Sequence, residues 1–224
     1  MDEASKVAAR TVAASLDRQW WLRTLAVFQS PRAVFAALRN DSDEEAAARQ
    51  EPVLAIIFLS GIAGVLSARE TGRLLDYWEV DAVLVAVVTF LSGGIYAFST
   101  YWLGGALLHL GIRAAGGAGS YRLSRHVLGF AAAPLALSLL LLWPVRLAVY
   151  GDDSFHRGGA DEGTGFWIFT GLSLAFAAWA GGLLVLGVSV VQRWTIGRAL
   201  VSVALIVLTL AIITTALLIP LSTR

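Results

Sequence analysis

The sequence predicts an all-α protein of the membrane, with five transmembrane helices and an amphipathic helix at the membrane interface near its amino terminus. Of the 224 residues, 57% are hydrophobic and only 15% are charged, whereas soluble domains are about 45–50% apolar and about 25% charged. Long uncharged runs recur along the chain, and no segment alternates as a strand would. Lipid is therefore the expected solvent for most of this surface.

Five runs have the length and apolarity of a membrane span, which needs about 20 mainly apolar residues. The second run has no charge across 31 residues. At about 1.5 Å per residue it exceeds a hydrocarbon core of about 30 Å, so it must tilt, break near Gly93 and Gly94, or extend into water. Pro134 and Pro144 predict that the third run is broken. The runs cover residues 52–68, 82–112, 126–150, 166–191 and 199–221.

Residues 1–51 precede these runs and form a separate arm in the predicted domain organisation, with residues 52–224 as the transmembrane domain. Apolar residues recur at helical spacing over residues 5–28, with basic residues between them. Ser30 is a suitable N-cap for a short helix that starts at Pro31. We expect the arm to lie in the headgroup layer, anchored by Trp20 and Trp21. The alternative is a helix that packs on the protein's own body.

The distribution of basic residues predicts the orientation, because Lys and Arg prefer the cytoplasmic side of a membrane. They concentrate in the arm and in the loops around residues 113–125 and 193–198, whereas acidic residues gather in residues 70–81 and 152–162. The amino terminus is therefore expected in the cytoplasm and the carboxyl terminus outside, with the cell (inner) membrane as the location. The net charge of +1 argues against a nucleic-acid partner.

The segment "GGAGSYRLSRHVLGFAAAP", residues 116–134, raises the question of a phosphate-binding loop. Arg122 stands where the third glycine of a dinucleotide fingerprint belongs, and the preceding run has the length of a helix rather than a strand. No lysine is present for a Walker loop. The segment is better interpreted as a polar turn, in which glycine ends one helix and Ser120 or Ser124 caps the next.

This segment also resembles the Yip1 domain family of five-span membrane proteins. "FQSPRAVFAAL", residues 28–38, is similar to the family's entry segment, and "GVSVVQRWTIGRALVSV", residues 187–203, resembles its fourth loop. The resemblance implies a cytoplasmic amino terminus and an outward carboxyl terminus. It does not extend to the Rab-binding role of eukaryotic members, because their long cytosolic arm is lacking here. The residues expected to maintain the family's shape are Pro31, Phe35, Gly117, Tyr121 and Pro134.

The leading functional hypothesis is a non-catalytic Yip1-like protein that binds lipid, a second copy of itself or another membrane protein. The apolar runs contain no carboxylate pair, so we expect no catalytic residue, no cofactor and no metal. The residues expected to contact headgroups or a partner are Arg113, Arg122, Arg125, Arg193, Arg198, Trp20 and Trp21. Mutations that reverse the charge of the loop arginines would then harm function.

The alternative is a transporter or channel for a small solute or lipid, acting as a homodimer. Its candidate polar path comprises Tyr96, Tyr101, His109 and Arg146. These are polar or ionisable side chains within the predicted spans, where such groups are costly and often functional. A third, weaker hypothesis assigns the acidic segment 151–165 a metal- or envelope-sensing role.

Overall fold

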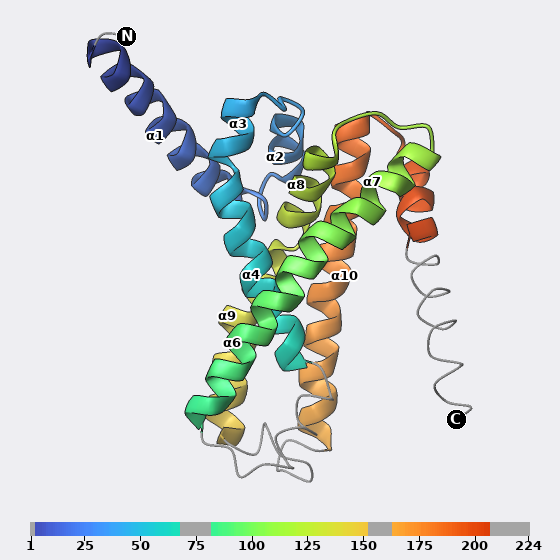
Figure 1. Ribbon diagram of the computed structural model, residues 1–224. Helices are drawn as coiled ribbons and strands as arrows, with labels where there is room; N and C mark the ends of the chain where they lie inside the picture. Colours follow the sequence, from blue (N-terminus) through green and yellow to red (C-terminus); the bar gives the residue numbers. More distant parts are fainter. Residues whose placement is uncertain (1–2, 68–81, 152–162, 207–224) are drawn as a thin grey trace, which may run out of the picture.

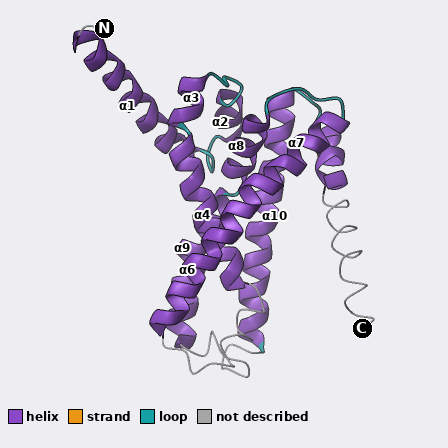
Figure 2. Ribbon diagram, in the orientation of Figure 1, coloured by secondary structure: helices purple, strands orange, loops and turns teal. Residues whose placement is uncertain are grey.

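The computed structural model describes residues 3–67, 82–151 and 163–206, and every regular element in these ranges is a helix (Figure 2). Four rods are long and apolar enough to cross a membrane, and they cover residues 43–67, 83–114, 121–150 and 164–192. A shorter apolar helix follows over Ile196–Ile206. The prediction of a multi-span α-helical protein is therefore confirmed for four spans. Most of the fifth predicted span lies outside the described residues.

The second rod is continuous and consists of α6 (Ala82–Ser99), a π-helical segment η1 (Thr100–Gly104) and α7 (Gly105–Ala114). The break considered near Gly93 and Gly94 is absent, because these glycines lie where α6 packs tightly on α4 (Gln50–Ser67). A Cβ atom built on Gly93 would lie 2.7 Å from Ile62 Cγ1. Figure 1 shows the unbroken rod running obliquely across the bundle, so tilt and extension into water are the two alternatives that remain.

The third rod is divided between α8 (Tyr121–Ala131) and α9 (Ala133–Tyr150). The division falls just before Pro134, which occupies the first turn of α9, where its missing N–H leaves no hydrogen bond unmade. Pro144 does not break the rod, since α9 continues through it to Tyr150. The prediction of a proline-broken span is thus right at Pro134 and wrong at Pro144.

The amino-terminal arm forms α1 (Glu3–Ala26), α2 (Pro31–Ala37) and α3 (Asp43–Ala48). Pro31 is at the start of α2, and Ser30 occupies the N-cap position without a side-chain capping bond. The arm supplies part of the core. Phe35 is fully buried, and a Cβ on Gly187 of α10 (Thr164–Gln192) would lie 2.8 Å from its ring. The lack of a side chain at Gly187 lets α2 pack against α10.

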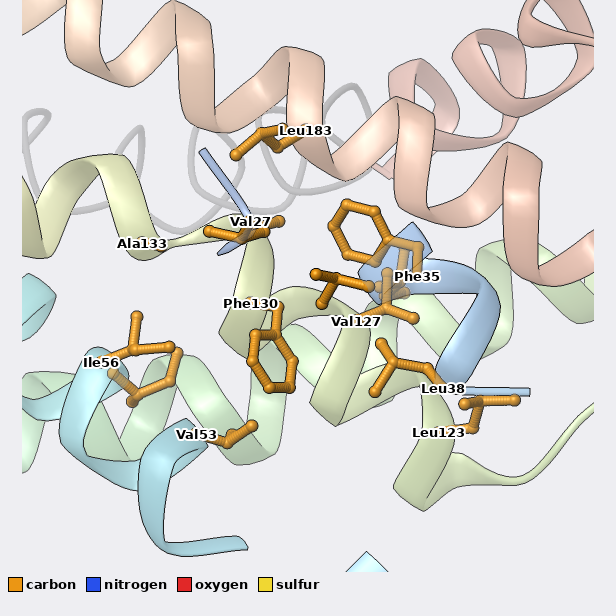
Figure 3. Packing of buried hydrophobic residues seen from close by; sticks show 14 of the residues in the cluster. Val27, Phe35, Leu38, Val53, Ile56, Leu123, Val127, Phe130, Ala133 and Leu183 are labelled. Carbon is orange, nitrogen blue, oxygen red and sulfur yellow. The ribbon is translucent and has the colours of Figure 1, made fainter. Parts of the chain in front are cut away.

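One apolar core joins the arm to the spans (Figure 3). The labelled side chains come from the arm, α4, α8, α9 and α10, and they converge around the ring of Phe130. The arm is therefore built into the body of the protein through buried apolar contacts. The labelled members are Val27, Phe35, Leu38, Val53, Ile56, Leu123, Val127, Phe130, Ala133 and Leu183.

Candidate functional site

Polar contacts gather at the end of the molecule that carries α1, α2, α3, α7 and α8 (Figure 1, top). The turn 115–120 and the turn 193–195 also lie at this end, beside α7 and α10. We call it the polar end. The opposite end carries the start of α6, the end of α9 and the start of α10.

Arg49 is the centre of a buried polar network. It lies in the polar stretch just before the first apolar run, where a charged side chain would be expected in water. Its side chain has no exposed surface. The guanidinium Nε donates to His126 Nδ1 at 2.6 Å, Nη1 donates to the Asn40 carbonyl at 2.8 Å, and Nη2 pairs with Asp41 Oδ1. A buried cation needs both a counter-charge and hydrogen-bond partners, and Arg49 has a carboxylate beside it and a partner for each of its three nitrogens.

His126 and Gln50 extend this network toward the second span. Because His126 Nδ1 accepts from Arg49, the ring is neutral and carries its proton on Nε2, which lies 3.2 Å from Gln50 Oε1. The Tyr101 hydroxyl donates to the same oxygen at 3.4 Å. The network thus connects four parts of the chain, namely α4, α8, η1 and the loop that precedes α3. The polar groups of the network form hydrogen bonds with one another, which is typical of a structural network rather than a reactive centre.

Arg122 is tied to the same loop from the other side. It pairs with Asp41 at 3.3 Å and with Asp43 at 2.8 Å, and it donates to the Asp41 carbonyl at 2.8 Å. Ser120 caps α8 by accepting from the Leu123 N–H at 3.0 Å, and its hydroxyl donates to Asp41. The expected helix cap at Ser120 is therefore present. Arg122, expected to contact headgroups, is already held by two carboxylates.

Trp20 is placed inside the protein. Its ring is fully buried, lies 5.6 Å from the Phe130 ring and donates from Nε1 to Glu45 Oε2 at 2.7 Å. The guanidinium carbon of Arg23 lies 4.5 Å from the centroid of the same ring. Trp21, the neighbouring residue, is exposed. Of the two tryptophans expected to anchor the arm in lipid, only Trp21 is on the surface.

The glycine-rich turn is held closed by side chains from the carboxyl end of α10 and beyond. Gly116 and Gly119 have φ values of +77° and +126°, which favour glycine. Gln192 clasps Ala118, accepting from its N–H at 3.0 Å and donating to its carbonyl at 2.6 Å. Arg198 donates to the Ala115 carbonyl at 2.6 Å. Since the Ala118 N–H is taken, the segment is a braced turn, as its composition indicates.

Gly117 has a packing role in this turn. A Cβ there would lie 2.5 Å from Ile112 Cγ2 and 2.8 Å from the Trp194 ring. Arg198 also stacks over Trp194, 4.2 Å from the centroid. The turn therefore brings the second and fourth predicted loops together at the polar end.

Replacing Gln192 with alanine is expected to lower the free energy of unfolding by about 1 kcal/mol. The change removes both hydrogen bonds to Ala118 from a solvent-exposed turn, and each such bond contributes about 0.5–1.5 kcal/mol at most. Unfolding in mixed detergent micelles would measure it. Gln19→Ala, on the exposed surface of α1, is the matched control. Equal destabilisation by the two changes would contradict the bracing role.

Arg125 lies in an aromatic cage. Its guanidinium carbon is 3.9 Å from the Trp102 ring centroid, 4.8 Å from that of Tyr121 and 5.0 Å from that of Tyr101. Tyr121 closes the cage by donating to the Trp102 carbonyl at 2.6 Å. The Tyr121 ring also contacts the ring of His109, at 6.1 Å between centroids. Tyr121, expected to maintain the fold, thus also shapes the surroundings of a basic residue.

The four residues of the candidate polar path lie in different surroundings. Tyr96 lines a partly open cavity of about 260 Å³ between α4, α6, α8, α9 and α10. Tyr101 is buried and bonded to Gln50, and His109 lies against Tyr121. Arg146 stacks over Trp143 in α9, toward the opposite end. The cavity wall is mainly apolar, with Ser60 and Thr100 as further hydroxyl residues.

The remaining predicted residues are on the surface or outside the described ranges. Arg113 and Arg193 are exposed, and Arg193 ends α10 in the left-handed conformation. Most of the acidic segment 151–165, including His156, is outside the described residues. Within the described ranges, no group of His, Asp or Glu side chains has the arrangement of a metal site.

Sequence reasoning missed the principal members of the buried network: Asp41, Arg49, Gln50 and His126. Residues 39–52 are mainly polar in the sequence, so nothing there indicates that the Arg49 side chain is buried. One signal was available. His126 is the first residue of the third apolar run, directly after Arg125, and a buried polar group requires a partner. The partner is 77 positions away in the chain, so its identity needed the fold.

The sequence profile of the Yip1 domain matches residues 25–218. The match covers most of the chain, from the last turn of α1 through the described part of the helix after α10. It includes every residue of the buried network and of the aromatic cage. No curated protein and no solved structure gives a significant match to the chain.

Proposed function

The chain belongs to the Yip1 domain family, and from that premise we propose that it is a non-catalytic membrane protein whose polar end binds an anionic lipid surface. This end lies on the cytoplasmic side, because the arm and the loops that form it carry the excess of basic residues. Each Lys or Arg near an anionic surface contributes about 1 kcal/mol of attraction. The lipid bilayer is the partner that this proposal requires.

The exposed apolar side of α1 carries the proposal. Trp21, Leu22 and Leu25 are 44%, 59% and 67% exposed, whereas Trp20 and Val27 are buried against the body. Arg18 is exposed beside this apolar side. Figure 1 shows α1 extending away from the bundle, with only its carboxyl half near α2 and α3. A helix that presents Trp and Leu together with Arg is suited to the boundary between headgroups and acyl chains.

The buried network supports binding over transport. Arg49, His126 and Gln50 hold the arm against α8 and η1, which keeps α1 at a defined position relative to the spans. The transport alternative has less support, because Tyr101 is bonded to Gln50 and His109 lies against Tyr121, whereas Tyr96 lines a mainly apolar cavity.

Single-cysteine labelling tests the position of α1, and the chain has no cysteine of its own. A nitroxide placed by Leu22→Cys in the full chain, reconstituted in bilayers, is expected to be relaxed by oxygen, which concentrates in lipid, and shielded from a water-soluble nickel chelate. Asp43→Cys on α3 is the control, since Asp43 is 95% exposed, and its label should show the reverse. If the label at position 22 were as accessible to nickel as the control, the proposal would fail.

A further inference from the structure

Arg125 is a partly buried arginine of the polar end that, unlike Arg49 and Arg122, has no counter-charge among the described residues. Arg49 and Arg122 pair with Asp41, and Arg23 approaches Glu45. Within the described ranges, no carboxylate forms an ion pair with Arg125, and its buried Nε has no hydrogen-bond partner. A partly buried cation without an anion is unfavourable unless a ligand supplies one.

The surroundings of Arg125 hold its guanidinium in one place. A Cβ on Gly105 would collide with Arg125 Cγ, so the glycine provides the space through which the side chain passes. Trp102 and Tyr121 then stack against the guanidinium. The π-helical segment that presents Trp102 is an uncommon element that occurs frequently at functional sites. A planar guanidinium fixed in this way is suited to bidentate contact with phosphate oxygens.

With the polar end placed among headgroups as proposed above, Arg125 would lie near the level of the lipid phosphates. The third candidate span begins at Tyr121, so Arg125 is four residues, or about 6 Å along the axis, inside its polar end. The second candidate span ends at Ala114 on the same side. Both span ends would then lie near the boundary between the headgroup layer and the hydrocarbon.

An apolar cavity lies next to the cage. Leu128, which lines the cavity of about 260 Å³, is one turn beyond Arg125 on α8, and Thr100 directly precedes Tyr101. Much of the remaining wall consists of glycine and alanine from α4, α6, α8 and α10. Gly181 has no atom within 4 Å of an added Cβ, so the space beyond it is open. The cavity is thus mainly apolar, and Leu128 and Thr100 connect its wall to the elements that carry the cage.

We propose that Arg125, Trp102 and Tyr121 bind the phosphate of an anionic phospholipid, with one acyl chain in the adjacent cavity. Charge complementarity selects an anionic headgroup, because Arg125 is partly buried, its Nε has no hydrogen-bond partner, and no described carboxylate pairs with it. The apolar cavity selects a lipid over free phosphate. The inference rests on the proposed position of the polar end among headgroups, but it concerns one bound lipid rather than the surface contact of α1.

Native mass spectrometry of the full chain in an uncharged detergent tests the site. Dioctanoyl phosphatidylglycerol, dioctanoyl phosphatidylcholine and inorganic phosphate are titrated separately. We expect a single tight phosphatidylglycerol adduct, at least tenfold weaker binding of phosphatidylcholine, and no retained phosphate. Retention of phosphate alone at the same concentrations would overturn the assignment to lipid.

Variants locate the adduct. Arg125→Gln is expected to weaken phosphatidylglycerol binding at least tenfold, whereas Arg113→Gln, the same change at an exposed residue of α7, should leave it within twofold. Leu128→Trp, which fills the cavity and leaves the cage charge intact, should also weaken binding and so reports on the site even if Arg125→Gln does not fold. Equal binding by the wild-type chain and Leu128→Trp, or by the two arginine variants, would refute the site. The nitroxide experiment at position 22 is independent of these binding measurements. If the lipid site is refuted, the proposed position of α1 is unaffected.

Discussion

Replacing Asp41 with asparagine is expected to lower the free energy of unfolding by about 3 kcal/mol. The change keeps the size of the side chain but removes the carboxylate that pairs with Arg49, whose side chain is fully buried. Removing one partner of a buried ion pair costs about 3–5 kcal/mol, because the other charge stays out of water without compensation. The low end applies, since Asp41 retains 20% exposure. Arg122 would lose a partner in the same step.

Asp43→Asn is the matched control for this prediction. Asp43 also pairs with Arg122, but its carboxylate is almost completely exposed, and surface ion pairs contribute about 0–1 kcal/mol. Both variants would be unfolded in mixed micelles, with helix content as the signal. We expect a difference of about 2 kcal/mol or more between them. Comparable stability of the two variants would mean that Asp41 does not neutralise Arg49.

Replacing Gly61 with alanine is expected to destabilise the protein by about 2–3 kcal/mol. A Cβ at this position would lie 2.5 Å from the Gly93 carbonyl oxygen and 2.6 Å from Ala97 Cβ. Neither neighbour can turn aside, because one is backbone and the other is a methyl group fixed to it. The helices α4 and α6 must therefore move apart, and overpacking of this kind typically costs about 1–3 kcal/mol. Close backbone approach at small residues is a main source of attraction between helices in lipid.

Gly182→Ala supplies the comparison for Gly61→Ala. No atom lies within 4 Å of a Cβ built on Gly182, so the added methyl group meets open space. Alanine is favoured over glycine inside a helix by about 1 kcal/mol, and the variant should be as stable as the wild type or slightly more so. Thermal unfolding in the same detergent, followed by tryptophan fluorescence, would separate the two. If both alanines destabilise equally, tight packing at Gly61 is not the cause.

Local features of the sequence predicted local features of the structure well. Pro134 indicated where the third rod divides, Ser120 indicated the cap of α8, and the glycines after Ala115 indicated a turn. Each depends on the conformational preferences of a few neighbouring residues. The prediction at Pro144 was wrong because it also relied on a local preference. Proline disfavours a helix interior, yet α9 continues through Pro144 to Tyr150.

Local features of the sequence did not predict which side of the arm is buried. Trp20 and Trp21 are adjacent and equivalent by composition, yet one is buried against Phe130 and the other is on the surface. The helix turns by about 100° per residue, so which of them faces the body depends on where α2 and α3 pack. That position in turn depends on Phe35 meeting Gly187, more than 150 positions away.

The sequence by itself determined that this chain belongs in lipid, where its long helices lie and that one set of connections is basic, because hydropathy and charge are properties of short windows. Only the tertiary structure decided which arginines are neutralised. Arg49 and Arg122 meet Asp41, whereas Arg125 meets three aromatic rings and no described carboxylate. Ion pairing depends on distances of a few ångströms between residues far apart in the chain, and only the packing of the helices sets those distances.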